Sequence, residues 1–253
     1  MNKRIKNIVT VVLLAAFLFG FGAWAALKPA DSLSLSERRR LKQLPAVRMD
    51  AVLSGKFMSD FEGYALDQSP LRDEWRTLKA LNRLYVYRQK DNNGVYIQDG
   101  YAAKLEYPMN EGSIDHAAER FRYLYENFMA DAGARVYLSV IPDKNYFLAE
   151  ANGYPAIDYE AFVEALREQT DFAQYIDLFG QLTLDDYYRT DSHWRQERLP
   201  AVAACLAREM GVTLTDEYTE QVLDRPYYGV YYGYAALPMQ PDELRYLTSE
   251  TLE

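Results

Sequence analysis

The sequence predicts an α/β layered domain that is preceded by a transmembrane helix and a short helical segment. Residues 8–27 form one uncharged apolar run, and residues 52–87 place apolar side chains at helical spacing. Short apolar runs then alternate with amphipathic patterns over residues 95–211, as in domains that pack helices on a parallel sheet. The expected divisions are a cytoplasmic stub with a transmembrane signal-anchor (1–28), a juxtamembrane and helical segment (29–90) and the α/β domain (91–253).

Composition narrows the classes of ligand. The 253 residues include 28 basic and 37 acidic side chains, and this excess of acid argues against nucleic acid because phosphate binding needs clustered cations. The single cysteine, Cys205, allows no intramolecular disulfide and is expected to be a small buried side chain. The two histidines, His116 and His193, are far apart in sequence, so no zinc site is expected. The sequence predicts no metal and no cofactor.

The N-terminus predicts a membrane segment. Lys3, Arg4 and Lys6 precede residues 8–27, which as a helix are long enough to cross the ~30 Å hydrocarbon core of a bilayer. Basic residues ahead of the run predict a cytoplasmic N-terminus and an extracytoplasmic remainder. Residues 23–25 (Ala-Trp-Ala) also fit a signal-peptide cleavage site, which would release a secreted protein. The length of the run favours an uncleaved single-pass anchor.

Two helices are expected between the anchor and the domain. Apolar side chains recur at helical spacing over residues 52–66, with Gly55 as a weak point, and again over residues 71–87. Pro70 separates the two because proline disfavours α geometry in the residue before it. Residues 31–42 carry serines and arginines and are expected to be a solvated juxtamembrane segment.

The domain is expected to contain a β-hairpin and two further strands. Residues 95–97 and 102–107 flank Asp99-Gly100, a pair that favours a tight hairpin turn. Residues 135–142 follow a glycine as a nearly continuous apolar run, which is typical of a buried parallel strand. Residues 172–179 form another run of this kind.

Three helices alternate with these strands. Ser113 is expected to cap a helix over residues 114–130, Asp158 to cap one that ends at residue 168, and residues 195–210 to form the third. The side chains expected on the buried face of the first helix are Phe121, Leu124, Tyr125 and Phe128. His116 lies in the first turn of that helix and is expected to be exposed.

Two groups of polar residues are candidates for a site. Lys144 and Asn145 follow the expected strand 135–142 at its carboxyl end, where open α/β sheets collect functional loops, although a plain polar loop would carry the same residues. Asp191 and His193 would lie about 200° apart on a helix, but on the same side of an extended segment or turn. There Asp191 could fix the imidazole tautomer, as in Ser-His-Asp hydrolases. The alternative is a capped turn beside a structural histidine.

Several sequence blocks, taken together and in order, resemble the DHHW family, relatives of the SGNH-hydrolase-like proteins that O-acetylate alginate and other exopolysaccharides. The residues that carry the resemblance are Glu37, Leu41 and Pro45, followed by residues 55–57, 61–62, 67–73, 93–101, 140–144, 188–194 (Tyr-Arg-Thr-Asp-Ser-His-Trp) and 228–232 (Tyr-Gly-Val-Tyr-Tyr).

The resemblance implies an SGNH-hydrolase-like fold, a flavodoxin-like three-layer domain, with Asp191 as the orienting acid and His193 as the base. Lys144, Asn145 and Trp194 are the residues expected to bind substrate, and Trp194 would wall the site or pack beneath it. Position 192 is serine where the family name carries histidine, and the Ser192 side chain is expected to point away from the pair.

The nucleophile of such a hydrolase has no evident counterpart. In relatives a serine follows in a Gly-Asp-Ser-like block well after the Asp-x-His-Trp motif. Ser249 has no Gly-Asp before it and is expected to lack an apolar strand that would present it. We therefore expect an incomplete domain, a fragment without its nucleophile and the C-terminal part; a degenerate, inactive relative of natural length is the alternative.

The predicted function is an extracytoplasmic, membrane-anchored O-acetyltransferase or esterase. Its partners would be a cell-surface or exported polysaccharide, an acyl donor and the membrane. The alternative is a noncatalytic surface protein that binds a glycan or a partner through the tyrosine-rich residues 227–234, since aromatic faces stack on sugars.

Overall fold

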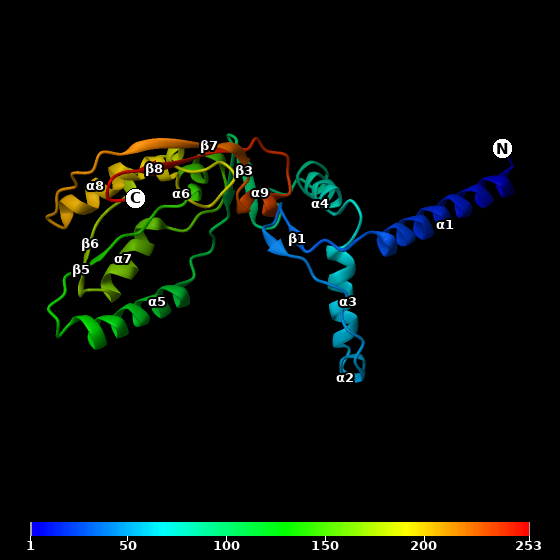
Figure 1. Cartoon of the computed structure of the whole chain (residues 1–253), viewed down its shortest axis with the longest axis horizontal. Helices are drawn as coiled ribbons and strands as arrows, with labels where there is room; N and C mark the ends of the chain where they lie inside the picture. Colours follow the sequence, from blue (N-terminus) through cyan, green and yellow to red (C-terminus); the bar gives the residue numbers. More distant parts are fainter. Residues whose placement is uncertain (1, 253) are drawn as a thin grey trace. The chain divides into compact units, whose positions relative to one another are not determined.

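Two units divide the chain after Asn82 in this computed structural model, which describes residues 2–252. The first is Met1–Asn82 and the second is Arg83–Glu253. Mixed helices and strands make up the second unit, as the predicted α/β class requires. Figure 1 shows the elements of both units in sequence colours.

The first unit is mainly helical. Its elements are α1 (Lys3–Leu27), β1 (Leu33–Ser34), β2 (Arg39–Arg40), α2 (Met49–Leu53), α3 (Lys56–Asp67) and α4 (Arg72–Leu81). The helix expected over residues 52–66 is broken at Gly55, the predicted weak point, where a φ of +78° ends one helix and starts the next. A π-helical turn, η1 (Asn82–Val86), follows α4 within the second predicted helix.

Helix α1 is the one described helix that is long and apolar enough to cross a membrane. It covers the predicted run of residues 8–27 and lies close to the N-terminus, so its length and composition fit either a membrane anchor or a signal sequence.

The second unit alternates short strands and helices. Up to α7 it contains β3 (Val95–Gln98), β4 (Tyr101–Lys104), α5 (Glu111–Leu124), η2 (Tyr125–Met129), β5 (Val136–Leu138), α6 (Lys144–Leu148), η3 (Glu150–Asn152) and α7 (Tyr159–Gln169). It continues with β6 (Ala173–Tyr175), η4 (Phe179–Gln181), η5 (Leu184–Asp186), η6 (Gln196–Arg198), α8 (Leu199–Glu209), β7 (Thr219–Tyr227), α9 (Val230–Ala235) and β8 (Asp242–Thr248).

The predicted hairpin is confirmed. Strands β3 and β4 pair antiparallel around Asp99 and Gly100, whose φ angles of 52° and 83° are those of a type I′ turn. Strands β7 and β8 form a second antiparallel pair.

Helices cover both faces of the parallel strand pair. β5 and β6 pair in parallel, with Val136 opposite Ala173. Val136, Tyr137 and Leu138 line a groove with side chains of α5, and Tyr137 also packs on the cluster that α8 completes. Because alternate strand residues point to opposite faces, this pair lies between a helix on one side and a helix on the other. Helices α5 and α7 pack side by side (Figure 1).

The sheet itself is smaller than the resemblance implies. Within residues 2–252 the strands form four separate two-stranded sheets, so they do not build the wide parallel sheet of a flavodoxin-like domain. The expected buried strand 135–142 pairs only over Val136–Leu138 and is half-buried, since one neighbouring strand covers one of its edges. Ile141, near its end, is 49% exposed.

The predicted details of α5 are wrong in two respects. Asn110, rather than Ser113, is the cap, and its Oδ1 accepts a hydrogen bond of 3.0 Å from the backbone N–H of Ser113. The buried residues are Ile114 and Ala118, because α7 packs closely on α5. Phe121, Leu124 and Phe128, expected to be buried, are 43%, 45% and 66% exposed. His116 is exposed, as predicted.

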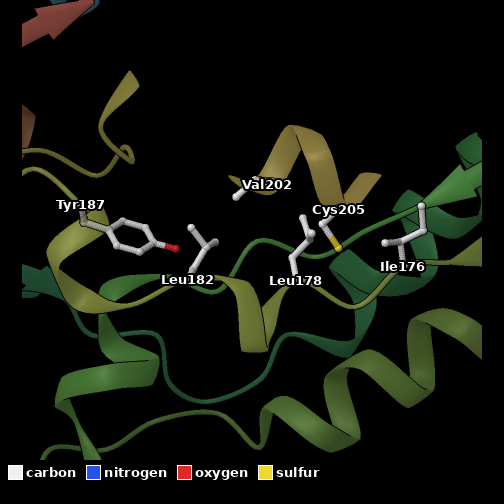
Figure 2. Packing of buried hydrophobic residues seen from close by; sticks show 6 residues of the cluster. All are labelled: Ile176, Leu178, Leu182, Tyr187, Val202 and Cys205. Carbon is white, nitrogen blue, oxygen red and sulfur yellow. The ribbon is translucent and has the colours of Figure 1, made fainter. Parts of the chain in front are cut away.

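The central core lies between the segment after β6 and helix α8. Figure 2 shows its members: Ile176, Leu178, Leu182, Tyr187, Val202 and Cys205. Cys205 is 4% exposed, which confirms its predicted burial. Gly211, with a φ of +74°, ends α8 as glycine commonly does after a helix. This core supports the segment that carries residues 187–194.

Removing a core side chain should destabilise the second unit. Leu178 is 1% exposed, and Leu178→Ala should lower the free energy of unfolding by about 2–5 kcal/mol, since it leaves a cavity. Urea denaturation followed by circular dichroism measures the change. Leu214→Ala, at a position 46% exposed, is the control and should change it by about 0.5 kcal/mol or less. Equal losses in the two variants would contradict the position of the core.

Candidate active site

Asp191 and His193 lie in a short hairpin loop. Tyr187 and Trp194 form an antiparallel bridge, and the N–H of Tyr188 donates to the carbonyl of His193 at 3.2 Å. The backbone of residues 188–193 is therefore a turn between two paired ends, as the spacing of the acid and the histidine predicts. In this geometry positions i and i+2 lie on one side, so the two side chains meet.

The acid is buried and the imidazole is exposed. Oδ1 of Asp191 lies 2.5 Å from Nδ1 of His193, with 1% of the acid side chain exposed against 74% of the histidine side chain. A carboxylate only accepts hydrogen bonds, so it selects the imidazole tautomer that carries its proton on Nδ1. Nε2 is then the nitrogen that can take a proton from another group.

Asp191 is held in its charged form. Its Oδ2 accepts the N–H of Val230 at 2.8 Å, and its Oδ1 accepts the N–H of His193 at 3.1 Å. Burial acts to raise the pKa of the Asp191 carboxyl, but the hydrogen bonds from the His193 ring and from these two N–H groups outweigh it, so the pKa is lowered. The pair therefore carries a charged acid beside an imidazole at neutral pH.

Thr190 connects the turn to two later elements. Oδ2 of Asp242, the first residue of β8, accepts the N–H of Thr190 at 2.8 Å and its hydroxyl at 2.5 Å. Oδ1 of Asp242 accepts the N–H of Arg189 at 2.7 Å. The Thr190 hydroxyl oxygen accepts the N–H of Gly229, and the Thr190 carbonyl accepts that of Tyr232. The sequence analysis did not predict these contacts. Of the residues that support the turn, Gly229, Val230 and Tyr232 belong to a block that carries the resemblance, whereas Asp242 does not.

Gly229 packs directly on Asp191. A Cβ at position 229 would lie 2.2 Å from the Cβ of Asp191 and 2.4 Å from its Cα. The φ of −81° is open to any residue, so the need for glycine is purely steric. This close approach allows the N–H of Val230 to reach the carboxylate.

Lys144 supports the turn from inside the domain. It is 2% exposed, and its Nζ donates to the carbonyls of Tyr188 at 2.8 Å and Arg189 at 3.2 Å. The ring of Tyr231 lies 5.2 Å from the same Nζ. Burial lowers the pKa of Lys144 to about 7, against the opposing charges of three nearby carboxylates, which belong to Asp242, Asp191 and Asp143.

Asn145 lies beside Lys144 at the start of α6 and is 1% exposed. Its Oδ1 accepts the hydroxyl of Tyr96 at 2.9 Å, and its Nδ2 donates to the carbonyl of Pro155 at 3.4 Å. Asp143 caps the helix. The structure thus brings Lys144 to the turn of residues 188–193 and gives Asn145 protein partners on both polar atoms. Substrate binding by either residue stays a prediction.

Ser192 does not point away from the pair, contrary to expectation. Its Oγ lies 3.3 Å from Nδ1 of His193 and 3.5 Å from Oδ1 of Asp191, because the tight turn folds the side chain back over the carboxylate. That position is on the acid side of the ring and not at Nε2. Trp194 is half-buried and packs against the core cluster, beneath the turn, and its predicted contact with substrate stays a prediction.

Ser249 follows a strand, β8, that carries charged side chains and is not the apolar strand of a nucleophile turn, and it lies at the end of β8 far from His193. It directly follows β8, whose first residue, Asp242, holds Thr190. Seven residues of extended chain cover roughly 20 Å. The Ser249 hydroxyl donates to Asp216 at 3.3 Å and accepts the N–H of Leu252 at 3.2 Å. Across residues 2–252 no hydroxyl hydrogen-bonds to Nε2 of His193.

No group of three or more His, Cys, Asp or Glu residues within the described part of the chain could hold a metal ion. The predicted absence of a metal or cofactor stays a prediction.

The sequence matches no protein-family model and no curated protein. Solved structures that are similar to it include the following two. One is a DHHW family protein from Eubacterium siraeum, with a TM-score of 0.47 and 19% identity over 62% of this chain and 55% of that chain. The other is Bacillus cereus PatB1 with a sulfonyl adduct, with a TM-score of 0.47 and 13% identity over 62% of this chain and 57% of that one. The alignments thus span little more than half the length of these two proteins.

A methyl group at position 229 should disturb the acid. Gly229→Ala places a Cβ against backbone and side-chain atoms of Asp191, so we expect a loss of about 1–3 kcal/mol in the free energy of unfolding. Urea denaturation measures it. Gly180→Ala is the control, since no atom lies within 4 Å of its added Cβ. A Gly229→Ala variant as stable as Gly180→Ala would show that the close approach is not present.

The buried lysine should make stability depend on pH. With its pKa lowered from 10.5 to about 7, Lys144 is neutral in the folded state while still protonated in the unfolded state above neutral pH. The unfolded state then binds more protons, so stability should rise with pH from about 7 to 9.

Lys144→Met should remove this rise. The measurement is the free energy of unfolding of both proteins at pH 6, 7, 8 and 9, since the difference between them cancels the other titrating groups. Parallel pH profiles would contradict the burial of Lys144.

Proposed function

We propose that this chain is part of an extracytoplasmic, membrane-anchored O-acetyltransferase or esterase of SGNH-hydrolase-like type that acts on cell-surface polysaccharide. One observation carries the proposal. A buried, charged Asp191 holds the exposed ring of His193 by Nδ1, with 2.5 Å between the two atoms. This is the arrangement by which hydrolases orient a general base.

The proposed chemistry is acyl transfer. Nε2 of His193 takes the proton of a hydroxyl group while the oxygen of that hydroxyl attacks the acyl carbonyl. Asp191 stabilises the imidazolium that forms. The imidazolium then returns the proton to the departing oxygen, which leaves His193 neutral again. A second hydroxyl, from the polysaccharide in a transferase or from water in an esterase, takes over the acyl group by the same two proton transfers.

The nucleophile in this proposal is a serine, as the resemblance implies. Within residues 2–252 no serine hydroxyl forms a hydrogen bond with Nε2 of His193. Ser192 lies on the Nδ1 side of the ring, and Ser249 is bonded to Asp216. What this chain supplies is the acid, the base and the residues that hold them. The anchor in the proposal is α1, because its apolar run follows basic residues that favour a cytoplasmic N-terminus.

A noncatalytic function is the alternative, and the tyrosine cluster favours it. The tyrosines of residues 227–234 lie at the end of β7 and on and beside α9, and all of them except Tyr234 are half-buried. Tyr228 and Tyr232 pack together with ring centroids 4.5 Å apart. Tyr234 is 56% exposed, so its ring face is available to stack on a sugar.

Loss of the imidazole should abolish ester turnover. In a protein that turns over an acetyl ester, His193→Ala should lower kcat by about 10²–10⁴-fold, since the general base is gone. Two controls are matched to it: His116→Ala removes the other histidine, which is exposed, and Ser192→Ala removes the hydroxyl on the wrong side of the ring. Both should leave the rate within a few-fold of the parent. An unchanged rate in His193→Ala would refute the assignment.

The binding alternative makes a different prediction. Tyr234→Ala should weaken retention on an immobilised polysaccharide by about 1–3 kcal/mol if its ring stacks on sugar, in line with the cost of losing an aromatic contact. Tyr107→Ala is the control, since Tyr107 is also exposed, at 63%, and lies outside the cluster. Equal retention of the two variants would count against glycan binding at α9.

A further inference from the structure

Helix α4 turns two of its charged side chains, those of Arg72 and Arg76, inward. Arg72 and Arg76 have side chains that are 16% and 20% exposed, and both form ion pairs with Glu37, at 3.0 Å for Arg76. Arg39 and Arg72 also reach Asp67, which is 8% exposed. Arg72 and Arg76 thus bury one face of α4 in a network of ion pairs within the first unit. A helix of a water-soluble protein has the opposite arrangement, with its apolar face inward.

The outward side of the same helix is apolar. We define the α4 apolar face as Leu71, Trp75, Leu78 and Leu81, which are 46%, 44%, 48% and 36% exposed. Their spacing of four, three and three residues puts them on one side of the helix. Lys79 borders this face, and Glu74 lies between Leu78 and Leu81 around the helix axis. Large apolar side chains that gather on an outward surface mark a surface with a partner.

A contact inside the first unit indicates what that partner is. The ring of Trp75 packs edge-on against Phe21 of α1, with ring centroids 6.4 Å apart and an interplanar angle of 75°. Phe21 lies six residues before Leu27, the end of the apolar helix, which is about 9 Å along the helix axis. If α1 spans the membrane, Trp75 therefore lies at the depth of the outer acyl chains and headgroups, where tryptophan is enriched.

Hydrogen bonds fix this relation between α1 and α4. The side chain of Gln68, three residues before Leu71, accepts the N–H of Asp31 at 2.8 Å and donates to its carbonyl at 2.9 Å. The same amide donates to the carbonyl of Lys42 at 3.0 Å. Asp31 itself lies four residues after the end of α1. The entry to α4 is thus tied to the exit of the apolar helix.

We propose that α4 lies in the membrane–water interface of the extracytoplasmic leaflet, with the α4 apolar face in contact with phospholipid. The proposal rests on α1 serving as a retained anchor. The ion-pair network replaces the water that the charged face of an interfacial helix would otherwise contact, and the apolar face is stabilised by the area that lipid covers. The chain would then bind the bilayer through two helices, one across it and one along it.

The test uses spin labels on the whole chain in phosphatidylcholine vesicles. Cys205 is buried, so a nitroxide thiol reagent labels a cysteine introduced elsewhere. Leu78→Cys and Leu81→Cys place the label on the apolar face, and Asp73→Cys places it on the charged side of the same helix. Collision rates with oxygen, which enters lipid, and with a nickel chelate, which stays in water, give the depth of each label.

The proposal predicts that labels at 78 and 81 collide several-fold more with oxygen than with nickel, relative to the label at 73. If the chain floats with the vesicles but the labels at 78 and 81 collide with the nickel chelate, α4 does not lie in the interface. That result would still agree with α1 as a membrane anchor. Labels shielded from both reagents would overturn it in favour of a protein partner. A chain that does not float with the vesicles would refute the anchor and this inference together.

Discussion

The site depends on one constraint: the carboxylate of Asp191 is buried and stays charged. Burying a charge is costly unless hydrogen bonds replace the lost water, and here the donors are the ring of His193 and the N–H groups of residues 193 and 230. Two of these donors belong to the same turn, and the third comes from the start of α9. The acid can therefore orient the imidazole only while α9 remains docked against the turn.

The supports around the turn follow from this constraint. Gly229 allows α9 to approach Asp191, and Asp242 accepts the N–H of Thr190. Lys144 donates to the carbonyls of residues 188 and 189 from inside the domain. Asp191 and Lys144 are almost fully buried. Asp191 accepts hydrogen bonds from the His193 ring and two N–H groups, and Lys144 donates to two backbone carbonyls. Buried charges of this kind add little to stability, and removing one partner leaves the other uncompensated. Within the pair, the acid is thus buried and the imidazole of His193 is open to solvent.

Local patterns predicted the local structure well, because turns and caps are set by neighbours in sequence. The Asp99-Gly100 hairpin, the Asp158 cap, the end of α8 at Gly211 and the meeting of Asp191 with His193 are of this kind. The errors came from tertiary contacts. The apolar stripe of α5 was expected to be buried, but the buried residues of this helix are Ile114 and Ala118. Asp242 and Gly229 act through contacts some 40–50 residues distant in sequence, which no local pattern encodes.

The most direct test of the central claim is the tautomer of His193, read from the ¹⁵N chemical shifts of its imidazole at alkaline pH. Only two histidines are present, so His116→Gln leaves His193 as the single signal. The structure predicts a neutral ring with its proton on Nδ1 and an unprotonated Nε2, and Asp191→Asn should disturb that preference. A neutral ring protonated at Nε2 in the parent protein would contradict an oriented general base.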